Sequence, residues 1–128
     1  MFEQDYLMRQ IKEFIAFMMK LLFGAELRTA DELIDYQQNS GDGSGVLFRM
    51  IDSGDIRKAE ELLYESMQTK TADNLLKGYA FYQYLAQQED EFLEAHDYSR
   101  RMIAEGVRRL AALFDASHLV SLFLPELE

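Results

Sequence analysis

The sequence predicts an all-α domain of antiparallel helical hairpins, with five to seven helices. Apolar residues recur at intervals of three and four in successive segments, which is the helical period. Glycines and polar turns separate these segments, and the chain holds one proline in 128 residues. Hydrophobic residues make up 48% of the chain, enough for one core and too many for a disordered protein. We therefore expect residues 1–128 to form a single domain.

The first segment, residues 1–24, is predicted to be an amphipathic helix. Its apolar stripe includes Phe14, Met18 and Leu22, and further Met and Phe residues widen it beyond what one neighbouring helix covers. We therefore expect this helix to be partly buried in its own chain and also to pair with a second copy of the chain through these three residues, which gives a homodimer. A helix lying on a membrane is the weaker alternative, because its polar face mixes acids and bases instead of carrying mainly Lys and Arg.

A polar, glycine-rich loop follows over residues 39–45 and is expected to be flexible. A capping box at residues 29–32 predicts a short helix before it. Glycines ahead of a helix can cradle a phosphate, but such loops follow a strand and bring a Lys. This loop follows a predicted helix and has no Lys nearby, so we interpret it as a linker.

Helical hairpins are predicted over residues 46–114. The chain turns at Ser53–Gly54, and Asp55 is expected to cap the next helix. A last long helix is predicted over about residues 90–114. A C-terminal helix over residues 117–124 then ends at the proline.

The hairpin over residues 47–64 resembles a tetratricopeptide unit. A shift of 34 residues, the period of that repeat, superposes apolar positions: Leu47, Met50 and Ile51 on Phe81, Tyr84 and Leu85. The resemblance implies tetratricopeptide-like packing and a helical interaction scaffold, although the Trp and Pro markers of that family are lacking.

Two stretches, Met1–Glu13 and Phe92–Arg100, carry a second resemblance. Both are similar to a small family of uncharacterised bacterial proteins of the Firmicutes type. Because that family has no established activity, the resemblance implies a bacterial helical protein and brings no catalytic residue and no cofactor.

The net charge of −10 limits the kinds of partner. Residues 24–99 carry sixteen acids and six bases, which argues against nucleic acid, whose binding depends on clustered Lys and Arg. No apolar run reaches the roughly 20 residues of a membrane span, so we predict no stable membrane insertion. The chain has no cysteine, which excludes thiol chemistry and suits a cytoplasmic location.

Aromatic residues crowd one segment of the hairpin region. Tyr79, Tyr82 and Tyr84 point around the predicted helix and are candidates for gripping a partner, since Tyr is favoured at interfaces. Packing in the core is the favoured alternative. A third hypothesis is an apolar pocket near Tyr79 and Tyr82 that senses a small molecule.

Arginines gather on the last helix. Arg100, Arg101 and Arg108 have spacings that place part of the set on one helical face, where they can bind an anionic ligand or an acidic tail. Pairing with the acidic surface of the same protein is the more common role of such residues.

A metal-binding enzyme is the alternative function, with Glu94, His96 and Asp97 as its ligands. The spacing does not fit, because helical metal sites use Glu-x-x-His and the residue three before His96 is Leu93. We therefore predict no metal, no cofactor and no catalytic residue. The leading hypothesis is a non-catalytic protein–protein interaction or adaptor module that self-associates.

Overall fold

The computed structural model describes residues 2–23, 44–69 and 71–113. This part of the chain contains helices and no strand, which confirms the predicted all-α fold. The helices are α1 (Phe2–Phe23), α3 (Ser44–Asp52), α4 (Ile56–Ser66), α5 (Ala72–Ala86), α6 (Asp90–Ala95) and α7 (Arg100–Leu113).

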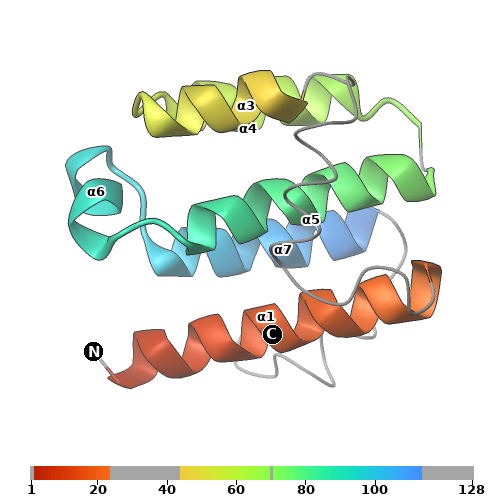
Figure 1. Ribbon diagram of the computed structural model, residues 1–128, viewed down its shortest axis with the longest axis horizontal. Helices are drawn as coiled ribbons and strands as arrows, with labels where there is room; N and C mark the ends of the chain where they lie inside the picture. Colours follow the sequence, from red (N-terminus) through yellow and green to blue (C-terminus); the bar gives the residue numbers. More distant parts are fainter. Residues whose placement is uncertain (1, 24–43, 70, 114–128) are drawn as a thin grey trace.

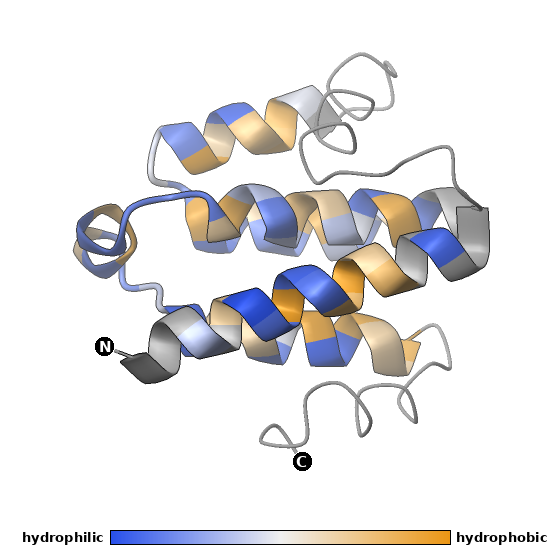
Figure 2. Ribbon diagram, turned by 60° about the horizontal axis from the view of Figure 1, so that its bottom comes forward, coloured by the Kyte–Doolittle hydropathy of each residue, from blue (hydrophilic) through white to orange (hydrophobic). Residues whose placement is uncertain are grey.

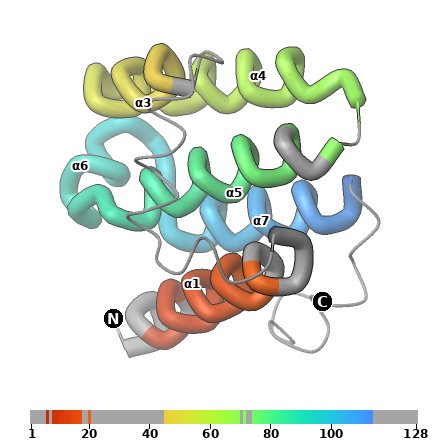
Figure 3. Tube along the Cα trace, turned by 45° about the vertical axis from the view of Figure 1, so that its right-hand side comes forward, coloured from red at the N-terminus to blue at the C-terminus, as the bar shows by residue number. Residues whose placement is uncertain are grey.

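The helices form three layers (Figures 1 and 3). The α3–α4 hairpin makes one outer layer, α5 and α7 make the middle layer, and α1 makes the other outer layer. The short helix α6 lies at one end of the middle layer. The middle layer is therefore covered on both faces, which explains why α5 buries residues on nearly every side.

Hydrophilic and hydrophobic residues alternate around α1, as expected of an amphipathic helix (Figure 2). Ile11, Phe14 and Ile15 are buried against the middle layer, whereas Tyr6 and Phe17 are exposed. No helix in the described ranges is long and apolar enough to cross a membrane.

The turn between α3 and α4 lies where the sequence places it. Gly54 adopts a φ of 91°, a conformation that side chains other than glycine rarely tolerate. Its N–H donates to Ile51 O (2.9 Å), and the next N–H, of Asp55, donates to Met50 O (2.9 Å), which is a Schellman motif. The predicted side-chain cap by Asp55 is wrong, because this turn holds Asp55 at a ψ of 54°, outside the extended region of capping residues.

The predicted long helix over residues 90–114 is also wrong, because a second Schellman motif divides it into α6 and α7. Tyr98 N–H donates to Leu93 O (2.9 Å), and Asp97 N–H donates to Glu94 O (3.2 Å). Asp97 takes the left-handed conformation, with a φ of 58°. Leu93 and Tyr98 are both buried and provide the apolar contact that accompanies this motif. The usual glycine signal is missing here, since Asp occupies the glycine position.

Several predicted elements lie outside the described residues. They are the helix expected before the glycine-rich loop, residues 39–43 of that loop, and the helix over residues 117–124. Ser44 and Gly45, which the sequence assigns to the loop, begin α3. Tetratricopeptide-like packing and the single-domain organisation stay predictions.

Candidate functional site

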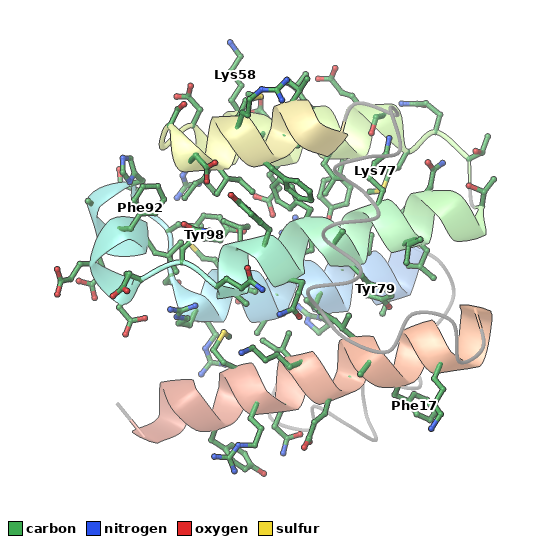
Figure 4. The ribbon with its side chains drawn as sticks, viewed as in Figure 1. Phe17, Lys58, Lys77, Tyr79, Phe92 and Tyr98 are labelled. Atoms are coloured by element: carbon green, nitrogen blue, oxygen red, sulfur yellow. The ribbon has the colours of Figure 1, made fainter. Side chains whose placement is uncertain are left out.

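A polar cluster centred on Glu60 lies between α4 and the middle layer. The carboxylate atom Oε2 of Glu60 accepts hydrogen bonds from the hydroxyls of Tyr82 (2.5 Å) and Tyr98 (3.1 Å). The Tyr82 hydroxyl also lies 2.8 Å from the hydroxyl of Tyr64. Tyr64 is on α4, Tyr82 is on α5 and Tyr98 is in the turn before α7, so the cluster joins three parts of the fold. Tyr98 is labelled in Figure 4.

The direction of each hydrogen bond follows from the number of hydrogens. A tyrosine hydroxyl has one hydrogen, and that of Tyr82 points to Glu60, so Tyr64 must donate to Tyr82. Burial raises the pKa of Tyr64, Tyr82 and Tyr98, and the nearby carboxylate of Glu60 raises the pKa of each further. All three hydroxyls therefore stay protonated at neutral pH and act as fixed donors.

Arg109 of α7 covers the outer side of this cluster. Its Cζ lies 5.6 Å from the centroid of the Tyr64 ring, and its NH1 lies 3.7 Å from Glu60 Oε2. The Arg109 side chain is 57% exposed, so its ion pair with Glu60 contributes little to stability. The guanidinium therefore forms a loose, polar cover over the Tyr64 ring.

A glycine on α7 makes room for the Tyr82 ring. A Cβ atom at Gly106 would lie 2.3 Å from Cε1 of Tyr82 and 2.6 Å from its hydroxyl. These distances are too short for any side chain, so α7 can approach the ring this closely only where it carries a glycine.

A groove of about 600 Å³ runs along the outer edge of this cluster. Seven residues line it: Arg57, Glu60, Glu61, Tyr64, Glu65, Gln68 and Arg109. Six of these come from α4 or follow it, which makes the groove about as long as that 11-residue helix, roughly 16 Å. The groove is open to the solvent, and Tyr64 and Glu60 of the polar cluster are among its lining residues.

The structure places two of the three predicted tyrosines inside the protein. Tyr79 and Tyr82 are both 0% exposed, in agreement with the core-packing alternative. Tyr79 packs edge-on against Phe14 of α1, with ring centroids 6.2 Å apart. Neither ring is accessible to a partner, so any binding surface must be formed by other residues.

Tyr84 lies at the surface between α5 and α3. Its ring stacks on Phe48 with centroids 4.6 Å apart, and its hydroxyl donates to Asp52 Oδ1 (2.7 Å). Partial burial and the Asp52 carboxylate raise the pKa of Tyr84 to about 12. These contacts give Tyr84 a role in joining two helices.

The predicted arginines are not brought together with the tyrosines. Arg100 is nearly buried and donates to Asp90 Oδ1 (2.7 Å), Ala86 O (2.8 Å) and Gln88 O (2.5 Å), which ties the start of α7 to the end of α5. Arg101 and Arg108 are exposed on α7. The arginine that contacts the tyrosine cluster is Arg109.

The self-association residues fall partly outside the described side chains. Phe14 is fully buried within this chain, and nothing is described for the side chains of Met18 and Leu22. The surface of α1 instead presents Tyr6 and Phe17, which are 48% and 36% exposed. Phe17 points away from the other helices (Figure 4).

His96 is part of the packing between two turns. Its Nδ1 lies 2.8 Å from Phe92 O. Its ring packs against Gly54 so closely that a Cβ atom at Gly54 would lie only 2.3 Å from His96 Nε2. Glu94 and Asp97 are exposed beside it, and the Asp97 carbonyl accepts a hydrogen bond from Arg57 (3.0 Å). Within the described ranges, no group of three or more His, Cys, Asp or Glu side chains is placed to hold a metal.

Comparison with protein families decides what the chain is related to. The model of DUF6483, a family of unknown function, matches residues 1–115. The chain belongs to the DUF6483 family. This confirms the predicted membership of an uncharacterised family, whereas the bacterial source and the tetratricopeptide resemblance stay predictions. No curated protein and no solved structure matches the chain.

Of the residues that form the cluster in this DUF6483 protein, Tyr82 was a candidate from the sequence, whereas Glu60, Tyr64, Tyr98 and Arg109 were not. Glu60 and Tyr64 are four residues apart, so they share a face of α4. This spacing is the one local signal that could have placed two of the cluster residues side by side. The contribution of Tyr98 depends on the break between α6 and α7. The contribution of Arg109 depends on how α7 lies against α4, which no sequence spacing specifies.

Proposed function

We propose that this DUF6483 protein is a non-catalytic interaction module that binds a basic segment of another protein in the α4–α7 groove. The observation that carries the proposal is the groove in which the partly buried Tyr64 and Glu60 lie beside the exposed Glu61 and Glu65. Its lining residues extend along the whole of α4, a length that suits a peptide or a helix better than a compact metabolite.

The charges in the groove favour a cationic partner. Of its two arginines, Arg57 donates to the Asp97 carbonyl and Arg109 lies against Glu60. Glu61 and Glu65 are exposed, and no salt bridge joins either to a described basic residue. With a net charge of −10, the protein attracts basic segments at long range and these two carboxylates then pair with them.

The Tyr64 ring adds selectivity for guanidinium or ammonium groups. Arg109 already lies over this ring at a cation–π distance. Because Arg109 is mostly exposed and loosely paired, a cation from the partner can replace it over the ring while Glu60 stays fixed by Tyr82 and Tyr98. Such preorganised groups lower the cost of binding.

The test is a nuclear magnetic resonance titration with two synthetic peptides of opposite charge. One carries Arg and Lys between apolar residues, and the other has Glu at the same positions. We expect the basic peptide to shift signals of α4 and of the Arg109 region, and Glu61→Gln/Glu65→Gln to weaken its binding about tenfold. Glu91→Gln/Glu94→Gln, which removes two exposed charges from α6, is the matched control and should leave binding within about twofold. Shifts spread over the whole acidic surface, or equal losses in both variants, would refute the groove.

Homodimerisation is a second part of the proposal. Tyr6 and Phe17 are eleven residues apart, which is close to three helical turns, so both lie on the outward face of α1. We expect light scattering at two protein concentrations to give twice the mass of 14.9 kDa, and Tyr6→Glu/Phe17→Glu to return the monomer. A wild-type monomer at both concentrations would rule out this interface. A cytoplasmic location also stays part of the proposal.

A further inference from the structure

A second recess, of about 390 Å³, lies on the other side of the middle layer, next to α1. The residues that line it are Met8, Arg9, Lys12, Ala86, Asp90 and Arg100. They come from the first half of α1, the end of α5 and the starts of α6 and α7. This recess is independent of the α4–α7 groove, because it shares no residue with it.

The recess is basic in a strongly acidic protein. Three of its six residues are cations and one is an acid, although the chain as a whole carries 23 acids against 13 bases. Asp90 accepts a hydrogen bond from Arg100 Nε, so this acid offsets one of the three positive charges. Two positive charges therefore remain in the recess.

Arg100 forms the floor of the recess and keeps donors available. A guanidinium has five N–H groups. Arg100 uses three of them in short hydrogen bonds, to Asp90 and to the carbonyls of Ala86 and Gln88. A fourth is directed at Met8 Sδ (3.8 Å), which is a weak acceptor, and none of the described hydrogen bonds uses the fifth. The anchoring of Arg100, its weakly bound fourth donor and its one unused donor are the features of a preorganised anion site.

Arg9 and Lys12 line the recess from α1. They are three residues apart on α1, so their side chains lie on neighbouring positions of one face. Both are exposed, and no salt bridge joins either to a described acid. Their charges are therefore available to a bound molecule.

We infer that this recess binds a small phosphorylated molecule. A phosphate group carries up to two negative charges and several strong acceptors, which match Arg9, Lys12 and the spare donors of Arg100. The volume is at the lower end of the range for small-molecule sites. Met8 and Ala86 offer apolar contact for an organic part of the ligand.

The experiment is isothermal titration of the full chain with inorganic pyrophosphate at low ionic strength. We expect one site in the wild type and a loss of affinity of about tenfold or more in Arg9→Gln/Lys12→Gln, since two charge-assisted contacts are removed. The matched control is Arg49→Gln/Lys58→Gln, which removes two exposed positive charges from the α3–α4 layer. Lys58 points away from the rest of the molecule (Figure 4). The control should change the affinity less than about twofold.

Absence of heat from pyrophosphate binding in the wild type would overturn the inference. An equal loss in both double variants would also overturn it, because the binding would then reflect overall charge. All four substituted side chains are exposed, so circular dichroism should show the same helix content and the same thermal midpoint in each variant.

Discussion

Two tyrosines of α5 should respond in opposite directions to the same substitution. Tyr79 and Tyr82 are three residues apart and both are 0% exposed. The hydroxyl of Tyr82 donates to Glu60 (2.5 Å) and accepts from Tyr64 (2.8 Å). The hydroxyl of Tyr79 is buried and has no hydrogen-bond partner among the residues that the structure describes. Replacing either residue by Phe removes one oxygen atom and leaves the ring.

The expected magnitudes follow from these partners. Tyr82→Phe loses a hydrogen bond to a charged group, worth about 1.5–3 kcal/mol, and a neutral one, worth about 0.5–1.5 kcal/mol. We therefore expect it to lower the free energy of unfolding by about 3 kcal/mol. Tyr79→Phe removes a buried polar group without a partner, whose burial costs about 1–3 kcal/mol, so it should raise the free energy of unfolding by about 1 kcal/mol.

Urea unfolding at neutral pH, followed by circular dichroism, measures both effects. The dependence of the free energy on urea should stay the same in both variants, because neither changes the surface buried on folding. Tyr64→Phe is a useful control, because it breaks the neutral bond to Tyr82 and leaves the one to Glu60; its other hydroxyl contact, with the mostly exposed Arg109, adds little, so it should cost about 1 kcal/mol. A loss from Tyr79→Phe as large as that from Tyr82→Phe would refute the assignment of hydrogen-bond partners.

Three further predictions concern pH and two glycines. Burial raises the pKa of Tyr79, Tyr82 and Tyr98 above the ordinary value of 10.0. These three groups leave the free energy of unfolding independent of pH below about pH 10 and lower it above, because the unfolded chain then releases protons that the folded chain retains. The free energy of unfolding should fall by about 1.4 kcal/mol per pH unit for each of these three tyrosines. The part of the tyrosinate absorbance that belongs to them should appear together with the loss of helix, after that of exposed tyrosines such as Tyr6. Complete tyrosinate absorbance while the helix content is retained would contradict the prediction. Gly106→Ala should lower the thermal midpoint although Ala favours helices by about 1 kcal/mol, because its Cβ would overlap the ring of Tyr82; an unchanged midpoint would mean that the ring can move. Gly54→Ala should cost about 1–2 kcal/mol or more in urea unfolding, because φ is 91° there, and a loss below about 0.5 kcal/mol would contradict it.

The helices could be predicted from the sequence where periodicity and turn residues agreed. The α3–α4 hairpin is the clearest case. Each of its two helices has an apolar stripe at helical spacing, and the turn between them contains Gly54, which has a positive φ. The division between α6 and α7 could not be predicted, because Asp97 takes the position that glycine usually holds. What stabilises that turn is the burial of Tyr98 against distant parts of the chain, including its hydrogen bond to Glu60.

The candidate sites were less predictable than the helices, for a physical reason. Arg100 and Tyr82 were candidates for partner binding because of their residue types. In the structure, most of the hydrogen-bonding groups of these two side chains bond to other residues of the same fold. The groups left for a ligand belong to residues that have no unusual sequence context, such as Glu61 and Lys12. A residue becomes available for binding when its surroundings leave it without a partner, and that condition depends on tertiary packing.

The layered fold also separates charges of opposite sign. The groove beside α4 exposes the carboxylates of Glu61 and Glu65, and the recess beside α1 exposes Arg9 and Lys12. The middle layer lies between them, and its largely apolar core keeps these groups apart, so that they do not neutralise one another. Arg100 and Glu60 are each held by hydrogen bonds to this middle layer or its adjoining turns, whereas Glu61, Glu65, Arg9 and Lys12 are exposed, so each candidate site joins a fixed inner group to exposed charged side chains. Because the two sites share no residue, our two proposals predict that a basic protein segment and a small anion bind at the same time without competing.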